Sequence, residues 1–149
     1  RDLPRRYLRT ELKPVAYATG VAKRKSTRFD LVLGVYSDAT CSVVVGETLA
    51  DAWAYARRTW PTLAESHDPG DEACVIEVDE QCVMLLDRGA TFATYAHEAV
   101  HVAAWILQSR GMPFDAKNEE GVAYLVEWVV TRGWPRVVAY ASRCSPSAS

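Results

Sequence analysis

Residues 91–109, TFATYAHEAVHVAAWILQS, form the stretch of sequence that decides the fold. Apolar residues recur in it at helical spacing and surround nearly the whole cylinder, which predicts one long helix. Thr91 suits the N-cap position of this helix, and Gly111 suits the position just after its last turn. Because a helix that is apolar on all sides is normally a buried one, we expect it at the centre of the fold.

Two of the three histidines of the chain lie in this helix, in the motif His97-Glu98-Ala99-Val100-His101. Residues four apart on a helix share one face, about 5–6 Å apart at Cβ, so the two imidazoles can bind one Zn²⁺ ion. A glutamate between them can take a proton from a water that the zinc activates. The motif predicts a zinc site with His97 and His101 as ligands and Glu98 as general base. The alternative is a pair of structural histidines on a buried helix.

A catalytic zinc site uses three protein ligands and keeps one position open. No histidine follows His101, so the third ligand comes either from His67 upstream or from a carboxylate on the next helix. Glu120 is the ligand that we expect if that helix packs antiparallel to the first. Glu119 and Glu127 are the alternatives on the same helix.

The two adjacent glutamates also have an explanation without metal. Acidic residues in the first turn of a helix interact favourably with the helix dipole. Asn118, directly before Glu119 and Glu120, is a natural N-cap residue. Together, these two observations can explain the presence of one of the two glutamates without a zinc ion.

The remaining pattern predicts an α+β domain with a mixed or antiparallel sheet around the motif-bearing helix. Alternation and strand-forming residues predict the strands, which are Phe29–Leu33, Cys41–Val45, Cys74–Val78 and Cys82–Leu86. A helix capped by Thr48 precedes Pro61, and a last long helix runs from about Glu119 to Arg132, where Gly133 and Pro135 are expected to end it.

The length of 149 residues predicts one domain, and no apolar run is long enough to span a bilayer. None of the four cysteines forms a CxxC pair, so we interpret them as thiols of a reducing, cytoplasmic compartment.

Charge is unevenly distributed along the chain. Residues 1–28 carry a net charge of +7, with nine Lys/Arg and two Asp/Glu, whereas the remainder carries −9, with eight and seventeen. We therefore divide the chain into a basic arm (1–28), a folded domain (29–142) and a tail (143–149). The arm is either a solvated segment or one that meets an acidic partner. The chain has no nucleic-acid-binding motif and no membrane segment, so neither partner is expected.

The chain resembles the gluzincin branch of the zincin metallopeptidases. The residues that carry the resemblance are those of the HExxH motif and Asn118-Glu119-Glu120-Gly121-Val122-Ala123-Tyr124, about a quarter of the chain. In that family a glutamate on the helix after HExxH is the third zinc ligand. An ExxA continuation, matched by Glu120 to Ala123, selects Glu120, whereas the thermolysin-like arrangement of Asn followed by the ligand selects Glu119.

The resemblance implies a small zincin-like domain that hydrolyses peptide bonds of a protein or peptide substrate. It also implies a strand beside the active-site helix whose edge pairs with the substrate, and Cys82–Leu86 suits this role. A tyrosine or histidine assists the oxyanion in such sites; Tyr124 is the residue that we expect, with Tyr95 and His67 as alternatives. A further resemblance to small zincin-like proteins of bacteriophages implies the host cytoplasm or the virion as location. It leaves a structural or binding component, with structural zinc and no catalysis, as the alternative function.

Overall fold

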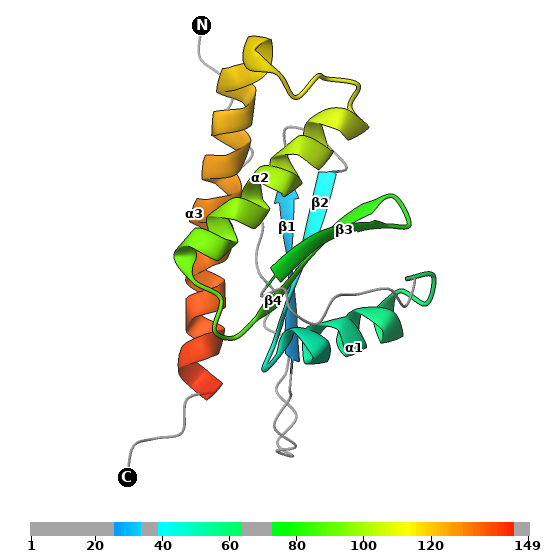
Figure 1. The fold of residues 1–149 in the computed structure, drawn as a ribbon, viewed down its shortest axis with the longest axis vertical. Helices are drawn as coiled ribbons and strands as arrows, with labels where there is room; N and C mark the ends of the chain where they lie inside the picture. The colour runs from blue at the N-terminus through cyan, green and yellow to red at the C-terminus, as the bar shows by residue number, and fades with distance from the viewer. Residues whose placement is uncertain (1–25, 34–38, 64–72, 145–149) are drawn as a thin grey trace, which may run out of the picture.

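The structure, a computed structural model, describes residues 26–33, 39–63 and 73–144 (Figure 1). The basic arm up to residue 25, His67 and residues 145–149 of the expected tail lie outside the described residues. None of the described helices is both long and apolar enough to cross a membrane.

Four strands form one mixed sheet in the order β1-β2-β4-β3. They are β1 (Ser26–Leu33), β2 (Ala39–Gly46), β3 (Ala73–Val78) and β4 (Gln81–Asp87). The central strands β2 and β4 run parallel, while β1 and β3 are antiparallel to their neighbours and form the two edges. The α+β class and the four expected strands are confirmed. Strand β1 begins at Ser26, so the last three residues of the segment assigned to the arm belong to the sheet.

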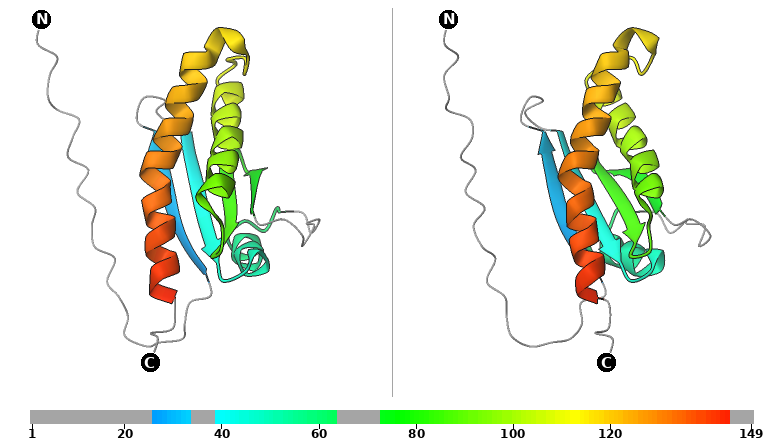
Figure 2. Two further views of the ribbon diagram at one scale, coloured as in Figure 1. Left: turned by 60° about the vertical axis from the view of Figure 1, so that its left-hand side comes forward. Right: turned by 90° about the vertical axis from the view of Figure 1, so that its left-hand side faces the viewer.

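Helix α1 (Leu49–Thr59) covers one face of the sheet, and helices α2 (Phe92–Ser109) and α3 (Glu119–Cys144) cover the other (Figure 2). Side chains alternate along the central strands, so each strand contributes residues to the core on both faces of the sheet. Val44 and Val83 pack towards α1, whereas Val43 and Met84 belong to the core beneath α2 and α3. Burial on both faces explains why the central strands contain the uninterrupted apolar runs 43–45 and 82–86 instead of alternating throughout.

The first helix begins and ends as its sequence predicts. The Thr48 side chain accepts a hydrogen bond from the backbone N–H of Asp51 and donates one to its carboxylate, as an N-cap residue does. The same N–H also bonds to the backbone carbonyl oxygen of Thr48. The helix ends at Thr59, and Trp60 forms its C-cap directly before Pro61.

Helix α2 begins after its N-cap Thr91 and ends before Gly111, whose φ of 68° is the left-handed conformation typical of this position. The expectation of a buried central helix holds for one side of α2 only. Tyr95 is fully buried, but His97 and His101 are exposed, and Val100 is 39% exposed. The helix has the sheet and α3 on part of its circumference only, so the face with the two histidines stays open.

The prediction that Gly133 and Pro135 end the last helix is also wrong, because α3 continues to Cys144. Val129 and Val137, on either side of these two residues, are both buried against the sheet layer. Pro135 removes one helical hydrogen bond, and the packing of the turns on both sides holds the helix together around it. Gly133 has a packing role instead, because a Cβ atom there would overlap the hydroxyl of Tyr95.

No disulfide joins Cys41, Cys74 and Cys82, the cysteines that the structure describes in full. The assignment of all four cysteines to a reducing compartment stays a prediction. Cys41 and Cys82 are buried and stand opposite each other in the register of β2 and β4, whereas Cys74 is half-buried. A side-chain hydrogen bond with Cys82, together with burial, raises the pKa of the Cys41 thiol well above its ordinary value.

Candidate active site

The two histidines of the motif meet on the open face of α2. His97 and His101 are one helical turn apart, and their Nε2 atoms lie 3.2 Å from each other. Two nitrogens bound at about 2.0–2.1 Å to one tetrahedral zinc ion lie about 3.3 Å apart. The two imidazoles therefore have the separation that two ligands of one zinc ion require.

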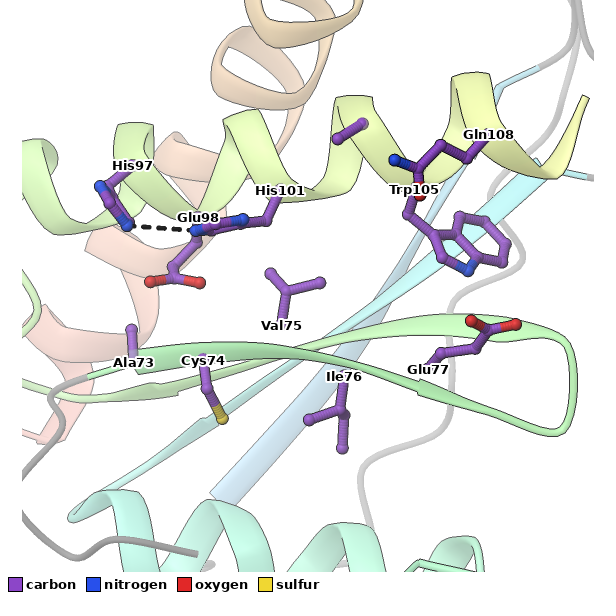
Figure 3. Close-up of a pocket in the computed structure, with 11 residues that line it drawn as sticks. Ala73, Cys74, Val75, Ile76, Glu77, His97, Glu98, His101, Trp105 and Gln108 are labelled. Carbon is purple, nitrogen blue, oxygen red and sulfur yellow. Dashed lines mark hydrogen bonds between the residues drawn. The ribbon is translucent and has the colours of Figure 1, made fainter. Parts of the chain in front are cut away.

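Glu98 lies next to this pair and is the only Asp, Glu, Lys or Arg in the described part of the chain that is buried, with 7% of its surface exposed. Its carboxylate points from α2 towards β3, below the histidine rings (Figure 3). All three side chains line a cleft of about 610 Å³ between α2 and β3. The general base predicted by the motif thus shares a cavity with both predicted ligands.

The strand beside the cleft is β3 and not β4. The family resemblance implied residues 82–86 as the substrate-pairing edge, but β4 is hydrogen-bonded to β2 on one side and to β3 on the other. Its backbone groups are therefore used within the sheet. Strand β3 is an edge strand, and its residues Ala73 to Glu77 line the cleft.

Helix α2 turns different faces to the cleft and to α3. The residues of α2 that line the cleft are spaced one, three or four positions apart in the sequence, so they lie on one face of the helix. The lining residues of α2 are His97, Glu98, His101, Ala104, Trp105 and Gln108. Tyr95 belongs to another face, because its hydroxyl donates a hydrogen bond of 3.1 Å to the carbonyl oxygen of Val129 in α3.

This arrangement keeps the predicted residues of α3 away from the histidines. Glu119, Glu120, Tyr124 and Glu127 are exposed, and none of them lines the cleft. Among the residues that the structure describes, no three His, Cys, Asp or Glu side chains are grouped as a metal site needs. The structure does not bring Glu120 to the histidine pair, and its role as third ligand stays a prediction.

Asn118 does not act as the N-cap that sequence analysis considered. A short 3₁₀ helix, Ala116–Asn118, precedes α3 and is capped by Asp115, whose side chain accepts from the N–H of Lys117. The side chain of Asn118 donates to the carbonyl oxygen of Pro113 and thus holds the connection between α2 and α3.

Neither tyrosine considered for the oxyanion lies in the cleft. Tyr95 is buried between α2 and α3, and burial raises its pKa well above the ordinary value. Tyr124 is 52% exposed on α3. The oxyanion role of Tyr124 is therefore not supported by its position.

Three residues at the far end of the cleft, Glu77, Trp105 and Gln108, were missed by sequence analysis. Two of them carry a signal in the sequence, because Trp105 and Gln108 follow His101 at spacings of four and seven residues. The third, Glu77, interrupts an apolar strand. The lining contains two carboxylates, those of Glu77 and Glu98, and no lysine or arginine among its described residues.

Comparison of the chain with protein-family models, with curated proteins and with the solved structures finds no significant match.

Proposed function

We propose that the protein is a zinc-dependent peptidase whose active site is the cleft between α2 and β3. One observation carries this proposal: the Nε2 atoms of His97 and His101 lie 3.2 Å apart beside the buried carboxylate of Glu98, in a cleft along an edge strand. The chemistry of two neutral imidazoles and a nearby carboxylate suits a zinc site with an adjacent general base.

The residues of the proposed site have separate roles in the proposed reaction. His97 and His101 would hold the metal, with Glu120 as the predicted third ligand. When bound, zinc would supply Lewis-acid activation of a water and of the substrate carbonyl. Glu98 accepts the proton of the attacking water and then donates it to the leaving amine. The outer edge of β3, which pairs with no strand among the described residues, offers backbone hydrogen bonds to an extended peptide and so orients the bond to be cleaved.

Metal content and peptide hydrolysis test this proposal together. The purified protein should contain zinc by mass spectrometry and should cleave members of a quenched fluorescent peptide library. Glu98→Gln should retain zinc and lose about 10²–10⁴-fold in kcat/KM, because the general base is removed. His101→Ala should lose the zinc.

The matched control is Glu80→Gln, which removes a carboxylate from the exposed turn between β3 and β4, outside the cleft. This variant should keep both zinc and activity. Hydrolysis by Glu98→Gln at the wild-type rate would contradict the proposal.

A second candidate function is a peptide-binding or structural component in which zinc is structural and catalysis is absent. The observation that favours it is that the described residues bring together only two of the expected ligands, with neither tyrosine in the cleft. It predicts peptide binding without hydrolysis, in wild type and Glu98→Gln alike.

A further inference from the structure

The end of the cleft away from the histidines is lined by a carboxylate, an indole and an amide, those of Glu77, Trp105 and Gln108. Along β3, side chains alternate between the two faces of the sheet. Ala73 and Val75 pack with the core under α2, whereas Cys74 and Ile76 pack with the core of α1. The same alternation directs Glu77 towards α2, and Figure 3 shows its carboxylate on that side of the strand.

Trp105 and Gln108 lie opposite Glu77. They follow His101 on the cleft-lining face of α2, and in Figure 3 the indole of Trp105 stands between α2 and the Glu77 end of β3. The rise of a helix places Trp105 about 6 Å beyond His101 along the axis. An extended peptide advances about 3.3 Å per residue, so this end of the cleft is about two residues from the histidine pair.

The charge of Glu77 is not neutralised within the described part of the chain. The side chain is exposed and makes no hydrogen bond or ion pair with any residue that the structure describes. The cleft-lining groups of α2 at this end are the indole of Trp105 and the neutral amide of Gln108. A carboxylate beside an aromatic face suits a cation with an apolar stem, since the stem packs on the ring and the ring face attracts the charge.

We propose that Glu77, Trp105 and Gln108 form a specificity subsite for a lysine or arginine side chain of the bound peptide. This subsite rests on the proposed function only in that the peptide occupies the same cleft. Glu77 pairs with the cationic group, Trp105 packs against the methylene stem, and the amide oxygen of Gln108 accepts a hydrogen bond from the cation. An acidic side chain at this position is repelled by Glu77.

Peptide binding tests the subsite without hydrolysis. The parent is Glu98→Gln, and the probes are fluorescent peptide pools with a fixed central lysine, norleucine or glutamate and randomised flanks. Anisotropy titration of the parent should show about five- to tenfold tighter binding of the lysine pool than of the norleucine pool, and weakest binding of the glutamate pool. The preference should shrink at high salt, because the pair is partly exposed.

Variants assign the preference to named residues. Adding Glu77→Gln should abolish the difference between lysine and norleucine, and adding Trp105→Leu should weaken lysine binding while the glutamate pool stays disfavoured. The matched control, Glu80→Gln, removes one negative charge from the same hairpin and should keep the preference. Circular dichroism of each variant shows whether it remains folded.

The outcomes separate this inference from the proposed function. Equal affinity for the lysine and norleucine pools in the parent, or an unchanged preference after Glu77→Gln, overturns the subsite even if the wild type cleaves peptides. A lysine preference that depends on Glu77 supports the subsite even if no peptide is cleaved.

A charge on an edge strand also discourages association between sheets. If this were the whole role of Glu77, Glu77→Gln would self-associate in analytical ultracentrifugation with no change in peptide preference, and that result overturns the subsite too.

Discussion

Cys41 and Tyr95 are ionisable residues that the fold keeps in apolar surroundings. Both side chains are buried, and the pKa of each is raised, for Cys41 first by its hydrogen bond with Cys82 and for Tyr95 first by burial. The folded protein therefore keeps both protons at a pH at which the unfolded chain releases them. Stability from these groups is present below their ordinary pKa values of 9.0 and 10.0 and is lost as pH rises above them.

We expect the free energy of unfolding to fall above about pH 9, by up to about 1.4 kcal/mol per pH unit for each group. Urea denaturation between pH 7 and pH 11 measures this. Tyr95→Phe should be about 1 kcal/mol less stable at neutral pH, because the hydrogen bond to Val129 is lost, but should show a shallower decline above pH 10. A decline as steep as that of the wild type would show that Tyr95 does not contribute.

At the level of elements, the contact between α2 and α3 determines which face of α2 is packed and which face is left for the cleft. Tyr95 reaches across to α3, where Gly133 leaves room for its hydroxyl, and Trp134 packs against both Tyr95 and Phe92 with ring centroids 5.6 Å apart. This contact uses one face of α2 and leaves the histidine face for the cleft. A glycine that looks like a helix stop in the sequence is thus a site of close approach between helices.

Two glycines of α3 should respond oppositely to the same substitution. Gly133→Ala should destabilise the protein by about 1–3 kcal/mol, because the new methyl group overlaps the Tyr95 hydroxyl. Gly121→Ala has no atom within 4 Å of the added methyl and should be neutral or stabilising by up to about 1 kcal/mol.

Thermal denaturation of both glycine variants makes the comparison. Combining Gly133→Ala with Tyr95→Phe should recover part of the loss, since the overlapping oxygen is gone. A Gly133→Ala variant as stable as the wild type would contradict the close approach.

The elements themselves could be predicted from the sequence to a large extent. The four strands, the N-caps Thr48 and Thr91, and the end of α2 before Gly111 follow from local rules on alternation, capping and backbone conformation. Pro135 could not be assessed in this way, because local rules do not include the packing of Val129 and Val137 on either side of it. Tertiary contacts there outweigh a local helix-breaking signal.

For the whole molecule, the source of the third ligand decides whether a bound zinc ion would connect two helices or only one. Both histidines are on α2, so a site of these two ligands alone leaves α3 independent of the metal. A third ligand from the first turn of α3 would require that turn to approach the histidine pair, and zinc would then stabilise the packing of α2 against α3.

We expect zinc at about 100 times its Kd to stabilise the protein by about 2.7 kcal/mol, which raises Tm by roughly 5–10 °C. Calorimetry with zinc and with a chelator measures the shift. Glu120→Ala should lose most of it, whereas the neighbouring control Glu119→Ala should keep it. The reverse result assigns the ligand to Glu119, and a full shift in both variants places the third ligand outside this pair.

The amino-acid sequence by itself determined the local parts of this protein: the helix with the HExxH motif, the strands and their alternation, and the pairing of two imidazoles one turn apart. These depend on the geometry of a few neighbouring residues. Only the tertiary structure decided that β3 and not β4 forms the edge beside the motif, that Glu77 and Trp105 share its cleft, and that Tyr95 and Tyr124 do not. Those features arise from contacts between segments far apart in the chain, where strand order and helix packing are set by how the whole core is filled.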